Sequence, residues 1–197
     1  TKQFIKLRLE NNVPKVEDLT PIELRAMRAS MAAVPTEHQV QINHIKEIQI
    51  KSENRKIKLR IYSNNDNDDL PLIIFFHGGG FVMGDLDSHD LLCRHLTKKT
   101  ECKLIAVDYS LAPENPYPAA LNDAVKSFKC LLRMGYKSQN IFIGGDSAGG
   151  NLSIVTILKL QESNESLPSK VFLLSPWADL TGEGVSIKEN SFSDPYL

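Results

Sequence analysis

The sequence has few cysteines and no long apolar run, and both shortages narrow the class of protein. Its three cysteines, Cys93, Cys102 and Cys130, share no CxxC spacing. This pattern indicates reduced structural thiols in a cytosolic protein rather than a disulfide framework or a zinc site. No apolar run approaches the roughly 20 residues that a membrane-spanning helix needs. The N-terminal residues contain no signal-peptide core. We therefore expect a cytoplasmic protein without an integral membrane segment.

The sequence also lacks an excess of charge of either sign. It has 23 Lys and Arg residues against 24 Asp and Glu residues, which gives a net charge of -1. This balance gives no reason to expect binding to nucleic acid or to anionic membranes. The 197 residues, 42% of them hydrophobic, are enough for one globular domain with a sizeable core.

Histidine is missing from the sequence after Ser147, the serine of a glycine-flanked motif. Residues 145–150 read GDSAGG and follow the apolar run 141–143. A strand, a glycine-flanked serine and a helix form the nucleophile elbow of α/β-hydrolases, so Ser147 is expected to be an acyl-transfer nucleophile in a strained turn. In that fold the triad runs Ser, then Asp or Glu, then His along the chain. All five histidines precede the serine: His38, His44, His77, His89 and His95.

A second glycine-rich motif, HGGGF at residues 77–81, follows the apolar run 72–76. Backbone N–H groups in such a loop stabilise the negative charge of a tetrahedral intermediate, and glycines let the backbone approach closely. Four residues are expected to contribute to this oxyanion hole: Gly78, Gly79, Gly80 and Ala148. His77 lies at the end of the strand, and we expect it to brace the loop through hydrogen bonds rather than to act in catalysis.

Hydrophobic patterning predicts an α/β fold. Continuous apolar runs are typical of strands covered on both faces; they occupy residues 72–76, 104–107, 141–143 and 171–174. Helical stretches separate these runs, at residues 88–100, 119–134 and 148–162. The alternation indicates βαβ units and a mainly parallel sheet with helices on both faces. The helix at 148–162 is apolar nearly all round, so we expect it to be deeply buried.

The residues before 72 have a different pattern. Runs 44–50 and 57–62 alternate between apolar and polar residues, which predicts two half-exposed antiparallel edge strands. Residues 20–23 read TPIE, a capping box with proline at the first helical position, which predicts a helix over 20–33. A second, weaker helix is expected within residues 1–19.

Taken together, the motifs resemble the hormone-sensitive-lipase-like group of α/β-hydrolases, the bacterial family IV esterases. Besides the two glycine motifs, the matching stretches are GDLDSH at 84–89, DYSLAPE at 108–114, PAA at 118–120, Asp123 and SPWADLT at 175–181. The resemblance implies an α/β-hydrolase core over residues 41–182. It also implies a helical cap segment over 1–40 and the start of a cap insertion over 183–197.

Three details of the resemblance concern single residues. Relatives usually carry arginine at the position of Ser110, so a local ion pair is expected to be lost. Glu114 and Asp123 are expected to have structural roles. Asp179 and Asp194 follow Ser147, but they match a turn residue and the cap segment, and neither is expected to be the triad acid.

Members of the family that this sequence resembles are longer than this chain. Relatives continue for roughly another hundred residues, a domain-scale length, which hold the last strands, the catalytic Asp and the catalytic His. The chain is therefore expected to be C-terminally truncated. An open strand edge at 171–174 then predicts aggregation, a homodimer or a complex with a complementary C-terminal fragment.

The favoured function is that of a serine carboxylesterase, which hydrolyses short- to medium-chain acyl esters through an acyl-enzyme on Ser147. No cofactor or metal is implied. An alternative is a non-catalytic protein that binds a small molecule on the same scaffold. Plant gibberellin receptors, which resemble this group but lack the catalytic histidine, are such proteins; they depart from the third glycine of the loop, whereas Gly80 is present here. A third reading, an inactive fragment of the esterase, is compatible with either function.

Overall fold

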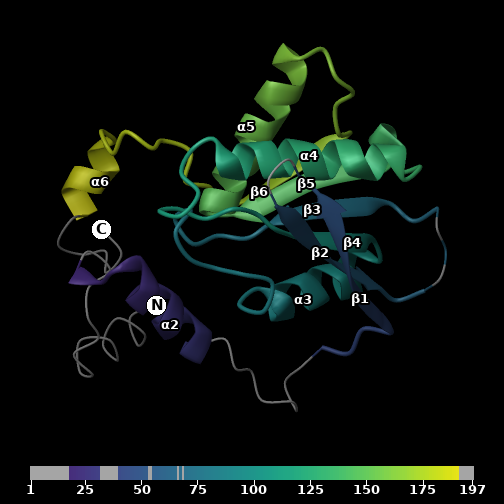
Figure 1. Ribbon diagram of the computed structural model, residues 1–197, viewed down its shortest axis with the longest axis horizontal. Helices are drawn as coiled ribbons and strands as arrows, with labels where there is room; N and C mark the ends of the chain where they lie inside the picture. Colours follow the sequence, from purple (N-terminus) through teal and green to yellow (C-terminus); the bar gives the residue numbers. More distant parts are fainter. Residues whose placement is uncertain (1–17, 32–39, 53–54, 66, 68, 191–197) are drawn as a thin grey trace.

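The computed structural model describes residues 18–31, 40–52, 55–65, 67 and 69–190, and its centre is a six-stranded sheet with strand order β1-β2-β4-β3-β5-β6 (Figure 1). The strands are β1 (His44–Lys51), β2 (Lys56–Ser63), β3 (Leu72–Phe76), β4 (Lys103–Asp108), β5 (Ile141–Asp146) and β6 (Lys170–Leu174). Strand β2 is antiparallel to both β1 and β4, and the other neighbouring pairs are parallel. The predicted mainly parallel sheet is confirmed.

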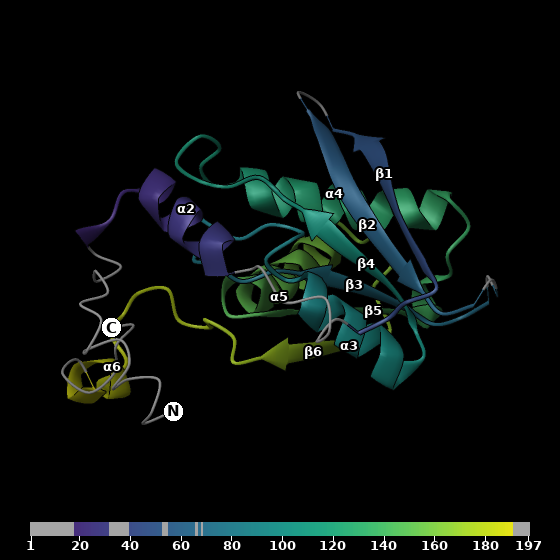
Figure 2. The ribbon, with the colours of Figure 1, turned by 90° about the horizontal axis from the view of Figure 1, so that it is seen from below.

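Helices cover both faces of this sheet, as expected. The helices of the described ranges are α2 (Pro21–Met31), α3 (Asp90–Thr100), α4 (Ala119–Arg133), α5 (Ala148–Glu162) and α6 (Val185–Asn190), with a short 3₁₀ turn at Ser138–Asn140. Helices α4 and α5 lie on one face and α3 lies on the other (Figures 1 and 2). Within the described ranges, no helix is both long enough and apolar enough to cross a membrane.

The continuous apolar run of β3 reflects its position between two cores. Side chains of neighbouring residues on a strand point to opposite faces. Ile74 and Phe76 belong to the core on the α4–α5 side, whereas Ile73 and Phe75 belong to the core on the α3 side. Every residue of β3 is buried. The strand is therefore a rigid support for the loop that follows it.

Two expectations about exposure were wrong. Strand β2 is not an edge strand, because it pairs with β4 as well as with β1. Helix α5 is buried over its first half but not over its whole length, since Leu158 in the second half is 56% exposed. The apolar run of β6 is also uncovered in part, and Val171 is 45% exposed at the edge of the sheet.

Helix α2 begins at the predicted capping box. The Thr20 N–H donates to the Glu23 carboxylate at 2.8 Å, and the Glu23 N–H donates to the Thr20 hydroxyl at 3.3 Å. The helix is assigned to residue 31, and residues 1–17, with most of the weaker predicted helix, lie outside the described ranges. Arg25 joins α2 to the core, since its guanidinium donates to the carbonyls of Val82 and Ala112 at 2.7 and 2.8 Å.

A serine occupies position 110, where the loss of an arginine ion pair was expected, but a different arginine forms an ion pair close to this position. Asp123 is buried, and its carboxylate accepts hydrogen bonds from the Ser110 N–H at 2.9 Å and from the Ser110 hydroxyl at 2.6 Å. The guanidinium of Arg55 lies 3.3 Å from the same carboxylate and 2.6 Å from the Ser110 hydroxyl. Arg55 therefore supplies the positive charge from the turn before β2, and the expected loss of the ion pair was wrong.

Candidate active site

The two glycine-rich motifs follow neighbouring parallel strands. From β3 the chain crosses to β4 on one side, and it then passes to β5 on the other side of β3. The carboxyl ends of strands on either side of such a reversal form the crevice in which α/β proteins bind ligands. Phe76 at the end of β3 pairs with Gly145 near the end of β5. The HGGG loop and the turn at Ser147 consequently begin side by side.

Ser147 lies in a strained turn between β5 and α5. Its φ and ψ angles of 51° and −118° are values that residues with a side chain rarely adopt. A side chain at Gly149 would place its Cβ 2.0 Å from the Phe76 carbonyl oxygen, and one at Gly145 would lie 2.3 Å from the same atom. Glycines therefore allow the start of α5 to press against the end of β3.

The backbone of Ser147 is fixed on both sides, whereas its hydroxyl has no hydrogen-bond partner among the described residues. The Ser147 N–H donates to the Leu174 carbonyl at 3.0 Å, and the Ser147 carbonyl accepts from the Trp177 N–H at 2.9 Å. The side chain is half-buried at the positive end of the α5 dipole. In the part of the chain that the structure describes, no histidine nitrogen is hydrogen-bonded to this hydroxyl.

The loop after β3 contains two glycines in the left-handed half of conformational space, Gly79 with φ 125° and Gly80 with φ 61°. The Gly79 carbonyl accepts the N–H of Met83 at 3.0 Å, which closes a turn. The Gly78 N–H donates to the Asp146 carboxylate at 2.9 Å, so in this structure the expected oxyanion donor Gly78 already has an acceptor within the protein.

The three other expected donors remain available. Among the described residues, the N–H groups of Gly79, Gly80 and Ala148 have no hydrogen-bond acceptor. A Cβ at Gly149 would lie 2.6 Å from the His77 carbonyl oxygen, which places the start of the loop against the start of α5. Backbone N–H groups of this kind can stabilise a developing oxyanion.

His77 is buried beneath the loop. Its Nδ1 donates to the Gly78 carbonyl at 2.9 Å, and its ring stacks on Tyr109 with a centroid separation of 4.3 Å. The Tyr109 hydroxyl in turn donates to the His77 carbonyl at 2.6 Å. Burial lowers the pKa of His77 to about 4, so the ring is neutral near pH 7. These contacts favour the bracing role that the sequence predicted.

Sequence reasoning missed Asp146 and His89. Asp146 stands directly before Ser147, and its second carboxylate oxygen lies 3.4 Å from the His89 Nε2. The available signal was the proximity of GDLDSH to HGGG along the chain. By contrast, Asp179 behaves as the turn residue that was expected, because its carboxylate accepts from the Thr181 N–H and hydroxyl. Asp194 lies outside the described ranges.

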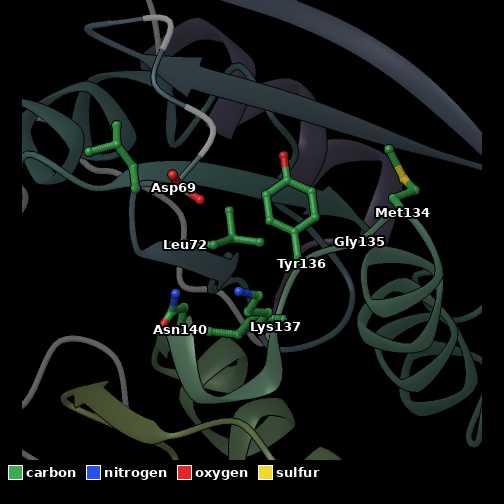
Figure 3. Close-up of a pocket in the computed structure, with 9 residues that line it drawn as sticks. Asp69, Leu72, Met134, Gly135, Tyr136, Lys137 and Asn140 are labelled. Carbon is green, nitrogen blue, oxygen red and sulfur yellow. The ribbon is translucent and has the colours of Figure 1, made fainter.

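A cavity of about 290 Å³ lies outside this crevice, and Figure 3 shows side chains that line it. Its lining includes Leu72 and Ile141, the first residues of β3 and β5, together with Tyr136, Lys137 and Asn140. It is therefore at the amino ends of β3 and β5, whereas Ser147 lies beyond the carboxyl end of β5. In the described ranges, no three His, Cys, Asp or Glu side chains are grouped to hold a metal ion. Cys93, Cys102 and Cys130 are free thiols.

Comparison with known proteins finds similar sequences among esterases. Residues 73–197 match the family described as having the α/β-hydrolase fold. An esterase from Acinetobacter venetianus is 34% identical over 198 residues, which cover 100% of this chain and 62% of that protein. A carboxylic ester hydrolase from Mycobacterium tuberculosis is 36% identical over 80% of this chain and 44% of its own length.

Solved structures give the same result. EstE1, a thermophilic carboxylesterase from a metagenomic library, superposes with a TM-score of 0.83 at 32% identity, over 90% of this chain and 62% of that one. An esterase of the bacterial hormone-sensitive lipase family superposes with a TM-score of 0.81 at 28% identity, over 96% of this chain and 61% of that one. The chain thus spans less than two thirds of the length of these relatives.

Proposed function

The chain belongs to the α/β-hydrolase fold family, in its hormone-sensitive-lipase-like group, and on that premise we propose that the protein is a serine esterase with Ser147 as its nucleophile. The observation that carries the proposal is the position of Ser147. The residue lies in a strained turn at the end of β5, beside the loop after β3, in which the N–H groups of Gly79 and Gly80 have no acceptor among the described residues. The names of the relatives support ester hydrolysis as the reaction.

In the proposed reaction, the Ser147 oxygen bonds to the ester carbonyl carbon and its proton passes to a general base. The carbonyl electron pair moves to the oxygen, and the N–H groups of Gly79, Gly80 and Ala148 stabilise the resulting negative charge. Collapse expels the alcohol, which takes the proton from the base. Water then attacks the acyl-enzyme, releases the carboxylic acid and restores the serine.

The general base is the part of this mechanism that the described residues do not supply. In this fold the triad acid and base follow the serine along the chain, whereas all five histidines precede Ser147. The 197-residue chain alone should therefore hydrolyse p-nitrophenyl esters only feebly. We expect residual catalysis of roughly 10³–10⁴-fold over water from binding and the oxyanion hole. Full esterase turnover by the mass-verified chain would overturn this expectation.

The decisive test uses the complete protein and a fluorophosphonate, which reacts with an activated serine. Labelling should occur at Ser147 and be lost in Ser147→Ala, with ester hydrolysis reduced roughly 10⁴–10⁶-fold. Ser163→Ala is the matched control, because Ser163 is exposed at the other end of the same helix. A folded protein that binds esters but neither reacts with the reagent nor hydrolyses them would favour the binding-protein alternative.

We further infer that α2 and α6 belong to a cap that shapes the acyl pocket. Both helices lie on the side to which the arrowhead of β6 points in Figure 2, which is the side of the carboxyl ends. The family resemblance supports short- to medium-chain esters as substrates. A series of p-nitrophenyl esters from acetate to palmitate tests this, and a preference for palmitate would contradict it. The three free thiols support the cytoplasm as the location.

A further inference from the structure

The carboxylate of Asp146 connects the two loops of the candidate site. Asp146 ends β5 and directly precedes Ser147, while Gly78 follows β3, 68 residues earlier. The Gly78 N–H donates to Asp146 Oδ1 at 2.9 Å. A hydrogen bond to an ionised acceptor is stronger than one between neutral groups. This bond therefore fixes the start of the oxyanion loop to the residue that carries the nucleophile turn.

The contact leaves no space for a side chain at Gly78. A Cβ added at Gly78 would lie 2.3 Å from Asp146 Oδ2 and 3.0 Å from the Asp146 carbonyl oxygen. The carboxylate thus packs directly against the loop backbone as well as bonding to it. Any shift of the Asp146 side chain must alter the position of Gly78, and with it the next two residues of the loop.

His89 supports the other oxygen of the same carboxylate. Its Nε2 lies 3.4 Å from Asp146 Oδ2, a long contact, and its ring is 6% exposed. Its Nδ1 lies 2.9 Å from the Ser88 hydroxyl oxygen. Ser88 is held in turn by Asp85, because the Ser88 N–H donates to the Asp85 carboxylate at 2.7 Å and the Asp85 N–H donates to the Ser88 hydroxyl at 2.9 Å. The turn before α3 therefore orients the imidazole.

The charge of Asp146 determines which side chain is the donor in the contact between Asp146 and His89. Burial raises the pKa of this carboxyl, but hydrogen bonds from His89 and from the Gly78 N–H outweigh burial, and the net pKa is below its usual value. The group is therefore an anion near neutral pH, and an anionic carboxylate only accepts hydrogen bonds. The hydrogen between the two side chains consequently resides on His89 Nε2.

We propose that Asp146 and His89 are positioning residues for the oxyanion loop, with His89 orienting the Asp146 carboxylate and that carboxylate holding Gly78 against the Ser147 turn. The proposal rests on the proposed function for its effect on catalysis. Neither residue takes part in the proton transfers of the reaction. Their role explains why Gly78 gives its N–H to a protein group, while the N–H groups of Gly79 and Gly80 find no acceptor in the described ranges.

The test combines hydrogen exchange with kinetics in the complete protein. Amide exchange of peptides covering residues 77–84 should accelerate at least tenfold in Asp146→Ala, while peptides of β4 stay protected. On an ester substrate, kcat should fall on the order of 10²-fold, with KM changed much less, because the loop acts on the transition state. Asp146→Asn retains an acceptor for the Gly78 N–H, so it should restore most of both losses.

A double-variant comparison tests whether His89 acts through Asp146. His89→Ala should give a smaller effect in the same direction, and adding it to Asp146→Ala should change nothing more. Asp90→Ala is the matched control, because Asp90 neighbours His89 but its carboxylate accepts from Tyr62 and Arg94 instead. It should lower stability without selectively accelerating exchange in 77–84.

Two outcomes would overturn the positioning role. One is loop exchange in Asp146→Ala that matches Asp90→Ala, and the other is an additive effect of the Asp146 and His89 substitutions. Failure of the proposed function gives a different result. In that case the unsubstituted protein hydrolyses no ester, while loop exchange still follows the expected pattern.

Discussion

Ser147 has a backbone conformation that glycine adopts more easily than serine. Strain of this kind costs about 1–3 kcal/mol, and part of it is offset in glycine by the greater chain entropy lost on folding. Ser147→Gly should therefore abolish the proposed esterase activity and yet raise the free energy of unfolding by about 1 kcal/mol. Urea denaturation of the complete protein measures the change.

Ser147→Ala is the control for this prediction. It removes the same hydroxyl but keeps the Cβ and therefore the strain, so its stability should stay within about 0.5 kcal/mol of the unsubstituted protein. Equal stabilities of the glycine and alanine variants would mean that the φ of 51° costs nothing here.

His77 should make stability depend on pH. Its folded pKa is about 4 because the ring is buried, whereas an unfolded histidine titrates near 6.5. Between these values the unfolded chain binds a proton that the folded protein does not. The free energy of unfolding is therefore not reduced by His77 above about pH 6.5, and it falls as the pH drops toward 4.

His77→Gln tests this linkage. Urea denaturation gives the free energy of unfolding of both proteins. The value for the unsubstituted protein minus that for the variant should fall by about 2–3 kcal/mol from pH 7.5 to pH 4.5. His95→Gln, at an exposed position of α3, is the control for the histidine-to-glutamine substitution itself. A pH-independent difference for His77→Gln would show that the buried ring takes up its proton without cost.

At the scale of elements, the Arg25 side chain joins α2 to the core. Arg25 donates to the carbonyls of Val82 and Ala112 and pairs with Glu114 at 2.7 Å, and its hydrogen bond lowers the pKa of that carboxyl to about 2. Arg25→Ala should loosen the helix without unfolding the sheet. Amide exchange in α2 should accelerate about tenfold, while exchange in β4 stays unchanged.

Ile22→Ala is the matched control for Arg25, because Ile22 is on the same helix with its side chain 75% exposed. It should leave exchange in α2 near the unsubstituted rate. If the two variants behave alike, the guanidinium contacts do not hold α2 to the core.

The elements that sequence predicted well have local signals. The capping box of α2 involves residues three positions apart, and the apolar run of β3 is continuous. The edge assignment of β2 failed because pairing with β4 joins residues tens of positions apart. Two further contacts also join residues far apart in the sequence and were not predicted. Arg55 lies 3.3 Å from Asp123, and the Gly78 N–H bonds to Asp146. The motifs thus gave the place of the candidate site, but not the contacts that hold it.

At the scale of the whole molecule, the edge of the sheet formed by β6 is partly uncovered in the part of the chain that the structure describes. Val171 is 45% exposed and Leu174 is 37% exposed, and among the described strands β6 has a neighbour on one side only. An open apolar edge pairs readily with other strands. We therefore expect the 197-residue chain alone to associate at micromolar concentration, as measured by light scattering after size-exclusion chromatography.

Two lysine substitutions distinguish the surfaces that drive this association. Val171→Lys puts a charge on the strand edge and should shift the chain toward monomer, because edge charges oppose strand pairing. Leu158→Lys, on the exposed side of α5 where Leu158 is 56% exposed, should leave strand pairing intact. If the α5 variant alone restores the monomer, association occurs through the helix face. A chain that is monomeric without either substitution would mean that the β6 edge is protected in solution.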